Sequence, residues 1–253
     1  MDLGLTGRTA VVCASTSGLG EATARALAAE GARVVVSGRR LERAEAIAAV
    51  FDDAVAVGVD LTDPDGPERL IAAAGEVDVL VLNSGGPPPS VATGIDTDQI
   101  RDALVPLLLA QQRLVSLVLP GMRSRGWGRI LGVGSTGVVA PIPGLALSNI
   151  GRAALGGYLK TLAAEVAGEG VTVNMLLPGR IATARTEGID AATAEREGID
   201  AAEARARSTA QIPAGRYGRP AEFGAVAAFL CSDAASFVTG TATRCDGGQV
   251  PSL

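Results

Sequence analysis

Histidine is missing from this 253-residue chain, and cysteine occurs only three times. Without histidine the chain lacks the one side chain whose ordinary pKa lies near neutrality, so histidine-dependent catalytic triads are excluded. Cys13, Cys231 and Cys245 are odd in number and match no zinc-binding spacing. We therefore expect no metal site.

Positive charge is also scarce, because 22 Lys and Arg face 27 Asp and Glu, for a net charge of −5. Binding to a nucleic acid or an anionic membrane needs clustered basic side chains, so the expected partner is a small-molecule substrate. The first residues show no secretory signal, and no continuous apolar run is long enough to span a membrane. A cytoplasmic protein without membrane contact is expected.

The composition, 47% hydrophobic and 19% charged, suits a folded chain with one large core. No linker rich in Gly, Ser or Pro divides it, so residues 1–253 are expected to form a single domain. Short β-branched runs alternate with helix-like stretches, which is typical of a parallel sheet covered on both faces. The sequence predicts an α/β, doubly wound, Rossmann-type fold. The predicted strands are residues 9–13, 33–37, 54–59, 77–82, 129–133 and 172–177.

A glycine-rich turn follows the first predicted strand and precedes a helical stretch over residues 21–30. Gly18 and Gly20 would let a pyrophosphate approach the backbone at the positive end of the helix. The spacing of strand, turn, helix and second strand is that of a dinucleotide-binding unit. The alternative is a tight turn without a ligand. The residues expected to contact the cofactor here are Ser15, Ser17, Gly18, Leu19 and Gly20.

The second predicted strand ends in Ser37-Gly38-Arg39-Arg40, where a ribose-binding acid would favour NAD. No carboxylate is present to repel a 2′-phosphate, and the planar donors of Arg39 could bind one, with Arg40 beside it. NADP(H) is therefore favoured, although NAD(H) stays possible. The alternative is that both arginines begin the next helix on a solvated face.

These motifs, in this order, resemble the classical short-chain dehydrogenase/reductase family over essentially the whole chain. The glycine turn resembles the family's Thr-Gly-x-x-x-Gly-x-Gly, with Ala14 in place of the first glycine. The other matching segments are Asp60-Leu61, Asn83-Ser84-Gly85-Gly86, Asn174 through Pro178-Gly179 to Thr183, Arg216 to Pro220, and Asp246-Gly247-Gly248.

The resemblance implies further site residues. Ile181 and Thr183 would hold the nicotinamide carboxamide, and residues 184–212 would form a mobile substrate lid. The family is commonly a tetramer, so a homotetramer is expected, with a dimer as the alternative. The other cofactor contacts implied by the matching segments are Asp60, Leu61, Asn83, Gly85, Pro178 and Gly179.

The catalytic positions depart from the family pattern of Ser, Tyr, Lys and a helical Asn. Ser135 fits the serine, but Ser148 stands at the tyrosine position and Arg152 at the lysine position. The asparagine aligns with Leu107. Tyr158 cannot replace the tyrosine, because ten residues of helix place it about 15 Å from Ser148, so we expect it to be a packing residue.

The consequence concerns proton transfer. A serine hydroxyl is a much weaker acid than a tyrosine, and Arg152 stays protonated, although it can hold ribose hydroxyls or offset oxyanion charge. One hypothesis is that Ser135, Ser148 and Arg152 bind a substrate carbonyl in an NADP(H)-preferring oxidoreductase of small ketones and alcohols, with the proton from water or substrate. The alternatives are a catalytically degenerate nucleotide-binding sensor or scaffold, and a non-redox lyase or isomerase.

Three further segments carry expectations. The loop with Pro87, Pro88 and Pro89 is either a stiff wall of the substrate crevice or a rigid surface loop. Two small polar helices are expected in the lid, with Asp200 capping one of them and Asp190 capping the helix before it. The apolar stretches 107–122 and 153–166 are expected to be buried, in part at subunit interfaces.

Overall fold

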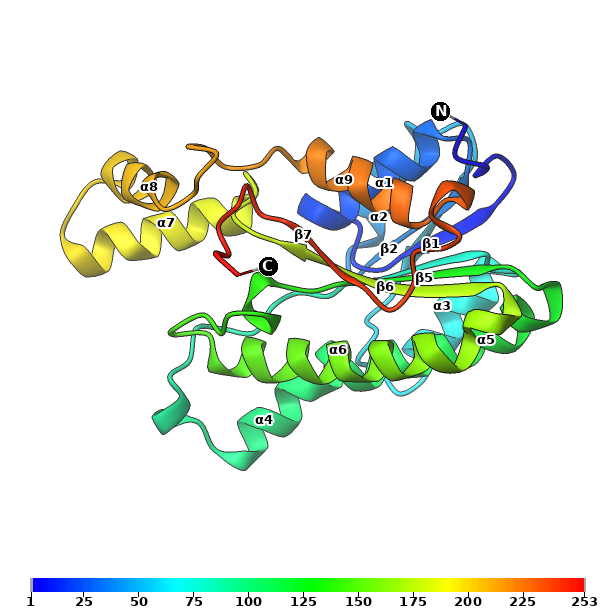
Figure 1. Cartoon of the computed structure of the whole chain (residues 1–253), viewed down its shortest axis with the longest axis horizontal. Helices are drawn as coiled ribbons and strands as arrows, with labels where there is room; N and C mark the ends of the chain where they lie inside the picture. The colour runs from blue at the N-terminus through cyan, green and yellow to red at the C-terminus, as the bar shows by residue number, and fades with distance from the viewer. Residues whose placement is uncertain (1, 253) are drawn as a thin grey trace.

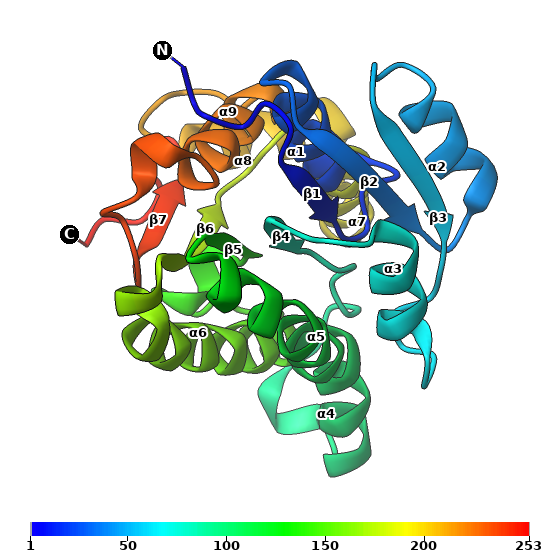
Figure 2. The ribbon, with the colours of Figure 1, turned by 90° about the vertical axis from the view of Figure 1, so that its right-hand side faces the viewer.

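The computed structural model describes residues 2–252, which form a seven-stranded, entirely parallel sheet. The strand order is β3-β2-β1-β4-β5-β6-β7. This order confirms the predicted doubly wound, Rossmann-type fold (Figure 2). The strands are β1 (Thr9–Val12), β2 (Arg33–Gly38), β3 (Ala54–Gly58), β4 (Val79–Leu82), β5 (Gly128–Val133), β6 (Val171–Pro178) and β7 (Ala242–Cys245).

The chain reverses its direction of travel across the sheet at β1 and β4. Val11 on β1 pairs with Val35 on β2 on one side and with Leu80 on β4 on the other. In doubly wound sheets the ligand crevice lies beyond the carboxyl ends of the strands at such a switch point. The loops that follow β1 and β4 therefore meet at the expected ligand site.

Helices cover both faces of the sheet, which explains the unbroken apolar runs of the central strands (Figures 1 and 2). Leu27, Ile47 and Phe223 pack on one face, whereas Leu70 and Leu114 pack on the other. The first face carries α1 (Gly18–Ala29), α2 (Leu41–Ala48) and α9 (Pro220–Leu230), and the second carries α3 (Gly66–Ala74), α5 (Ala110–Arg125) and α6 (Ala146–Val166).

All six predicted strands are present, and β7 was missed. The β7 sequence Ala-Thr-Arg-Cys is short, and none of its residues is fully buried, because it is the last strand of the sheet order and has only β6 beside it. A short edge strand of this kind lacks the apolar run that revealed the others.

A long helical run precedes β5 and departs from the predicted boundaries. It consists of α4 (Thr97–Leu104), a π-helical turn (Val105–Leu109) and α5. Pro106 has no backbone N–H to donate, and the Gln111 side chain donates to its carbonyl at 2.9 Å. By length and composition alone the run Thr97–Arg125 could cross a membrane, although charged residues such as Arg113 interrupt it. Its inward face packs in the core through side chains such as Leu114.

Two helices, α7 (Ala184–Glu197) and α8 (Ala201–Ala210), extend from the body of the domain near the carboxyl end of β6 (Figure 1). Asp200 caps α8 as predicted, accepting a hydrogen bond of 2.7 Å from the Glu203 backbone. The expectation for Asp190 was wrong, because this residue lies inside α7 and is buried. Its burial against another segment could not be read from the local capping pattern.

Short 3₁₀ turns complete the secondary structure. Some of them form loops at the carboxyl edge of the sheet, where the candidate site lies. These turns are η1 (Ala92–Gly94), η3 (Thr136–Val138), η4 (Ala167–Glu169) and η5 (Asp233–Ala235).

Candidate active site

The glycine turn after β1 is shaped by two residues in the left-handed region. Gly18 has φ +57°, and Ala14, at the position of the missing glycine, has φ +46°. Ala14 is the one non-glycine residue with positive φ among residues 2–252. This backbone explains why a glycine suits the position, since a Cβ makes the left-handed conformation costly.

Asn83, at the end of β4, holds the turn in place. Its side-chain amide donates to the carbonyls of Cys13 and Ala14, both at 3.2 Å. Ser15 is fully buried and ties β1 to β2, because its hydroxyl donates to Val12 and accepts from the Ser37 backbone at 2.9 Å. The Ser15 backbone N–H also donates to the Ser37 carbonyl, at 2.8 Å, so both donors of this predicted cofactor contact are committed to the fold.

The two turn glycines have different roles. A Cβ on Gly20 would collide with the Ala14 carbonyl and lie 2.8 Å from the Asn83 amide, so only glycine lets α1 start this close to β1. A Cβ on Gly18 would meet nothing nearer than Thr183, at 3.7 Å. The exposed Ser17 forms no side-chain cap on α1. The open backbone and the uncapped helix end fit a pyrophosphate.

Arg39 and Arg40 are exposed directly after β2 and form no ion pair within residues 2–252. Asp60, after β3, lies in the same corner. The pKa of Asp60 lies below its ordinary value, chiefly because Thr62 donates hydrogen bonds to its carboxylate and to a smaller extent because of the charge of Arg39. Arg39 is therefore close to the predicted adenine-contacting segment and has donors available for a phosphate.

The segment after β6 is held by the end of β7 and by the loop before α9. Gly179 donates to the Cys245 carbonyl at 3.0 Å, and a Cβ there would clash with Asp246. Ile181 is buried, and Thr183 caps α7 by accepting a bond from the Thr186 backbone. The predicted nicotinamide contacts Pro178, Gly179, Ile181 and Thr183 thus lie on one rigid stretch beside the glycine turn.

Ser135 lies just after β5, and Ser148 lies in the first turn of α6. The Ser135 hydroxyl oxygen accepts the Gly137 backbone N–H at 3.0 Å, which leaves its own proton free to donate. Asn149 holds the loop between these two serines, because its side-chain amide donates to the Ile142 carbonyl at 2.9 Å. A Cβ on Gly137 would lie 2.6 Å from the Asn149 side chain and 3.3 Å from the Ser135 hydroxyl, so the two elements meet there.

Arg152 lies one turn further along α6 and is buried. Its guanidinium donates to the backbone carbonyl of Val133 on β5 at 2.5 Å and to that of Ser84 after β4 at 3.2 Å. Burial, and to a lesser extent the charge of Arg185, lowers the pKa of Arg152 to about 10. Arg152 therefore joins the carboxyl ends of two strands through neutral acceptors only.

Leu107, at the aligned asparagine position, is fully buried and packs on Gly151 of α6. A Cβ on Gly151 would collide with the Leu107 side chain. The proline loop is tied to the same helix, because the Ser90 hydroxyl accepts the Leu147 backbone N–H at 3.1 Å. The loop over residues 84–90 thus lies beside the start of α6, which favours its interpretation as a wall of the crevice.

Two groups of site residues were missed by sequence reasoning. Arg185, in the first turn of α7, donates to the Gly86 carbonyl at 3.4 Å and so connects the expected lid to the loop after β4. Deeper in α7, the Asp190 carboxylate accepts the Tyr217 hydroxyl at 2.9 Å and lies 3.7 Å from Arg180. No sequence spacing predicts the contact of Arg185 with Gly86 or that of Tyr217 with Asp190, because the partners are 99 and 27 residues apart.

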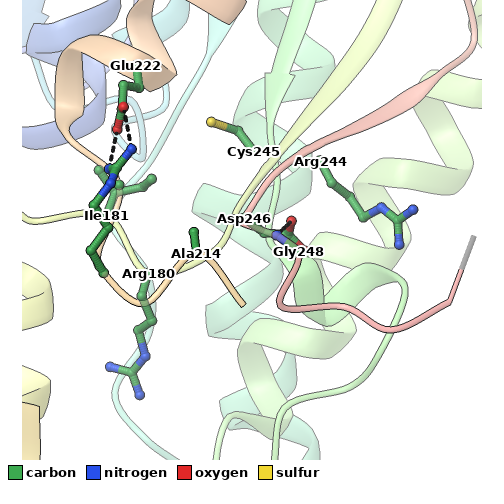
Figure 3. A pocket seen from close by; sticks show the side chains of 11 residues that line it. Arg180, Ile181, Ala214, Glu222, Arg244, Cys245, Asp246 and Gly248 are labelled. Carbon is green, nitrogen blue, oxygen red and sulfur yellow. Dashed lines mark hydrogen bonds and ion pairs between the residues drawn. The ribbon is translucent and has the colours of Figure 1, made fainter. Parts of the chain in front are cut away.

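A separate cavity of about 340 Å³ lies at the ends of β6 and β7 (Figure 3). Glu222 on one side forms a two-pronged ion pair with Arg216, which together with the Arg219 backbone lowers the Glu222 pKa to about 2. Figure 3 shows the Arg180 guanidinium pointing away from Glu222. Because the lining lacks Ser135, Ser148 and Arg152, this cavity is not the predicted chemical centre.

The thiols supply no reactive group to the site. Burial raises the pKa of Cys13 and of Cys231 to about 12, and it also raises the pKa of the half-buried Cys245. A thiol with a raised pKa is a poor nucleophile at neutral pH.

Comparison with known proteins covers nearly the whole chain. A family model described as enoyl-(acyl carrier protein) reductase matches residues 13–249. The 3-oxoacyl-[acyl-carrier-protein] reductase FabG of Vibrio cholerae is 33% identical, over 98% of this chain and 99% of its own. Dehydrogenase/reductase SDR family member 4 of Bos taurus is 34% identical, over 98% of this chain and 89% of its own.

Two solved structures show the same architecture over the full length of both chains. L-sorbose reductase from Gluconobacter frateurii, complexed with NADPH and L-sorbose, superposes with a TM-score of 0.94 at 30% identity. A putative NAD(P)-dependent gluconate 5-dehydrogenase from Beutenbergia cavernae with bound NADP superposes with a TM-score of 0.89 at 36% identity.

Proposed function

Because the chain belongs to the short-chain dehydrogenase/reductase family of oxidoreductases, we propose that it is an NADP(H)-preferring enzyme that interconverts a small ketone and its alcohol. The observation that carries the cofactor preference is the exposed, unpaired Arg39 where an acid would select NAD. The similar sorbose reductase was solved with NADPH, which supports the same cofactor.

The cofactor would be held by the glycine turn, by Asn83 through its support of that turn, and by the stretch from Pro178 to Thr183. Arg39 and Arg40 would bind the 2′-phosphate, and Asp60 and Leu61 would contact the adenine. Bound NADP(H) supplies or accepts the hydride. The chain itself has to bind the substrate, orient its carbonyl and manage the proton.

Ser135 and Ser148 are proposed to hydrogen-bond the substrate oxygen. Ser135 can donate, because its own oxygen is already occupied by the Gly137 N–H. Arg152 supplies positive potential from beneath the site and cannot relay a proton, since it stays protonated at neutral pH even with a pKa of about 10. The proton on the alcohol oxygen would then come from water or from the substrate.

The remaining parts of the proposal concern the lid, the assembly and the location. Residues 184–212 would close over the substrate, with Arg185 as the contact to the opposite wall. A homotetramer, or else a dimer, would cover apolar surface on the helices around Leu109, which is 56% exposed, and Ile150, which is 37% exposed. A cytoplasmic location is proposed.

The first experiment is a fluorescence titration of the purified protein with NADPH and NADH, followed by NADPH absorbance with a panel of ketones. In Arg39→Glu we expect NADPH affinity to fall by about tenfold or more and NADH affinity to hold, because a carboxylate repels the 2′-phosphate. Arg43→Glu, on the exposed side of α2, is the matched control and should leave both affinities unchanged.

The outcomes separate the alternatives. Turnover with NADPH supports the proposal, and binding without any turnover replaces it with a nucleotide-binding sensor or scaffold. Product formed without loss of NADPH indicates a lyase or isomerase. Absence of NADPH binding overturns the cofactor assignment.

A further inference from the structure

The charges around the candidate site are one-sided. The segments 83–95, 134–164 and 178–186, which form the site's walls, contain no Asp or Glu and carry four basic residues, Arg152, Lys160, Arg180 and Arg185. Lys160 lies two turns beyond Arg152 on α6 and donates to the Gly240 carbonyl at 2.8 Å. Arg180 is compensated, because it lies 3.7 Å from Asp190. Arg152 and Arg185 form no ion pair within residues 2–252, and only backbone carbonyls accept their hydrogen bonds.

The two unpaired guanidinium groups approach the same short loop. Arg152 donates to the Ser84 carbonyl from below, and Arg185 donates to the Gly86 carbonyl from α7. A Cβ on Gly86 would collide with the Arg185 guanidinium, so glycine makes room for this approach. Ser84, whose carbonyl accepts from Arg152, has a buried hydroxyl without a hydrogen-bond partner in the described chain. The loop of residues 84–86 thus receives two positively charged side chains and carries one hydroxyl without a partner.

Physical chemistry favours an anion at this place. A buried cation without a counterion is costly, and a second cation nearby adds repulsion, whereas a negative group bound between them would relieve both terms. Arg152 is too deeply buried to be the main contact. Arg185 is exposed, its one bond to Gly86 is long, and most of its donors are free for a carboxylate.

We propose that the substrate is an oxo acid, or the hydroxy acid in the reverse direction, whose carboxylate binds Arg185 above the buried charge of Arg152. This inference rests on the proposed function and specifies its substrate class. The carboxylate is unchanged in the reaction. The neighbouring carbonyl gains a hydride and a proton and becomes the alcohol, while NADPH is oxidised to NADP⁺.

Calorimetric titration of the protein loaded with NADP⁺, which has no hydride to give to an oxo acid, tests binding without turnover. The ligands are small α-oxo and β-oxo acids, each paired with its neutral methyl ester, and the same pairs are then assayed by NADPH absorbance. We expect acids to bind about tenfold or more tightly than esters, with the preference weakening as salt is added. Arg185→Ala should abolish the preference, and Arg185→Lys should restore part of it.

Arg196→Ala is the matched control, because Arg196 lies on the same helix and pairs with Glu197. It should leave the acid preference intact. Equal binding of acids and esters, an unchanged preference in Arg185→Ala, or no binding of any acid to the NADP⁺-loaded protein overturns the anionic-substrate proposal. Failure to bind NADPH, or failure to oxidise it with either member of any pair, counts against the proposed function instead.

Discussion

The glycine turn and the proposed catalytic wall, which consists of Ser135, Ser148 and Arg152, lie at the same edge of one sheet, yet they are built differently. The turn is made of backbone, with left-handed Ala14 and Gly18 and the Asn83 amide holding its carbonyls. The catalytic wall is made of side chains, with Arg152 joining the ends of β4 and β5. A backbone-built site needs glycine at defined places, whereas a side-chain-built site can exchange its residues on an unchanged frame.

This difference explains why the family pattern persists at one region and departs at the other. Replacing Gly20 would push a Cβ into the Ala14 carbonyl, so the position has almost no freedom. At the proposed catalytic wall, the resemblance implies that Arg152 stands at the lysine position and Leu107 at the asparagine position, where Leu107 is buried and packs on Gly151. These exchanges preserve burial and backbone hydrogen bonds while they change the available proton chemistry.

The largest effect is expected from a substitution in the glycine turn, which is built of backbone. Gly20→Ala should weaken NADPH binding by about tenfold or more and cost about 1–3 kcal/mol of stability, because the turn must shift to admit the methyl group. Fluorescence titration and urea unfolding measure the two effects. Gly157→Ala, in α6 with nothing within 4 Å of the added Cβ, is the control and should be neutral or stabilising. A Gly20→Ala protein with wild-type affinity would contradict this assignment of the turn.

The next largest effect is expected at the catalytic wall, where the family's tyrosine and lysine can be introduced. Ser148→Tyr with Arg152→Lys supplies a phenol of ordinary pKa about 10 beside an amine, so ketone reduction should rise by about tenfold or more. NADPH absorbance with a fixed ketone measures it. Ser148→Phe with Arg152→Lys has the same ring without the hydroxyl and should show no gain. An equal rise in both double variants, or none in either, argues against a site otherwise ready for reduction.

A smaller effect concerns the anchor of α7. Tyr217→Phe removes the hydroxyl that donates to the buried Asp190 carboxylate at 2.9 Å, so unfolding free energy should fall by about 1.5–3 kcal/mol. Trypsin should also cleave residues 184–212 faster. Asp190→Asn keeps an acceptor for the hydroxyl and should cost less. If Tyr217→Phe leaves both the urea midpoint and the cleavage rate unchanged, the bond does not hold the helix.

The smallest effect is expected from a second substitution in the glycine turn, at Ala14. Ala14→Gly should stabilise the protein by about 0.5–1 kcal/mol, because relief of the left-handed backbone outweighs the extra entropy of an unfolded glycine. Urea unfolding measures the gain. Ala46→Gly, on the exposed face of α2, is the control and should destabilise by about 1 kcal/mol. Destabilisation by both substitutions would show that the left-handed backbone at Ala14 carries no cost.

Prediction from sequence succeeded where local pattern and burial agree. Six strands, including the edge strand β3, were predicted from their apolar runs, and β7 was missed because its sequence Ala-Thr-Arg-Cys has no such run. The apolar stretch from Leu107 was predicted as one helix, but the π-helical turn containing Pro106 moves the start of α5 to Ala110. Asp190 has the local pattern of a cap and instead lies buried against Tyr217, a contact that sequence spacing does not reveal.

The doubly wound fold and the glycine turn could be predicted from the chain alone, because each depends on residues close together in the sequence. The electrostatics of the site could not, because they depend on contacts between distant residues. Arg152 and Arg185 meet the loop after β4 from 68 and 99 residues away, and neither forms an ion pair within residues 2–252. A charge's free energy depends on its neighbours in space, and those neighbours are set by packing.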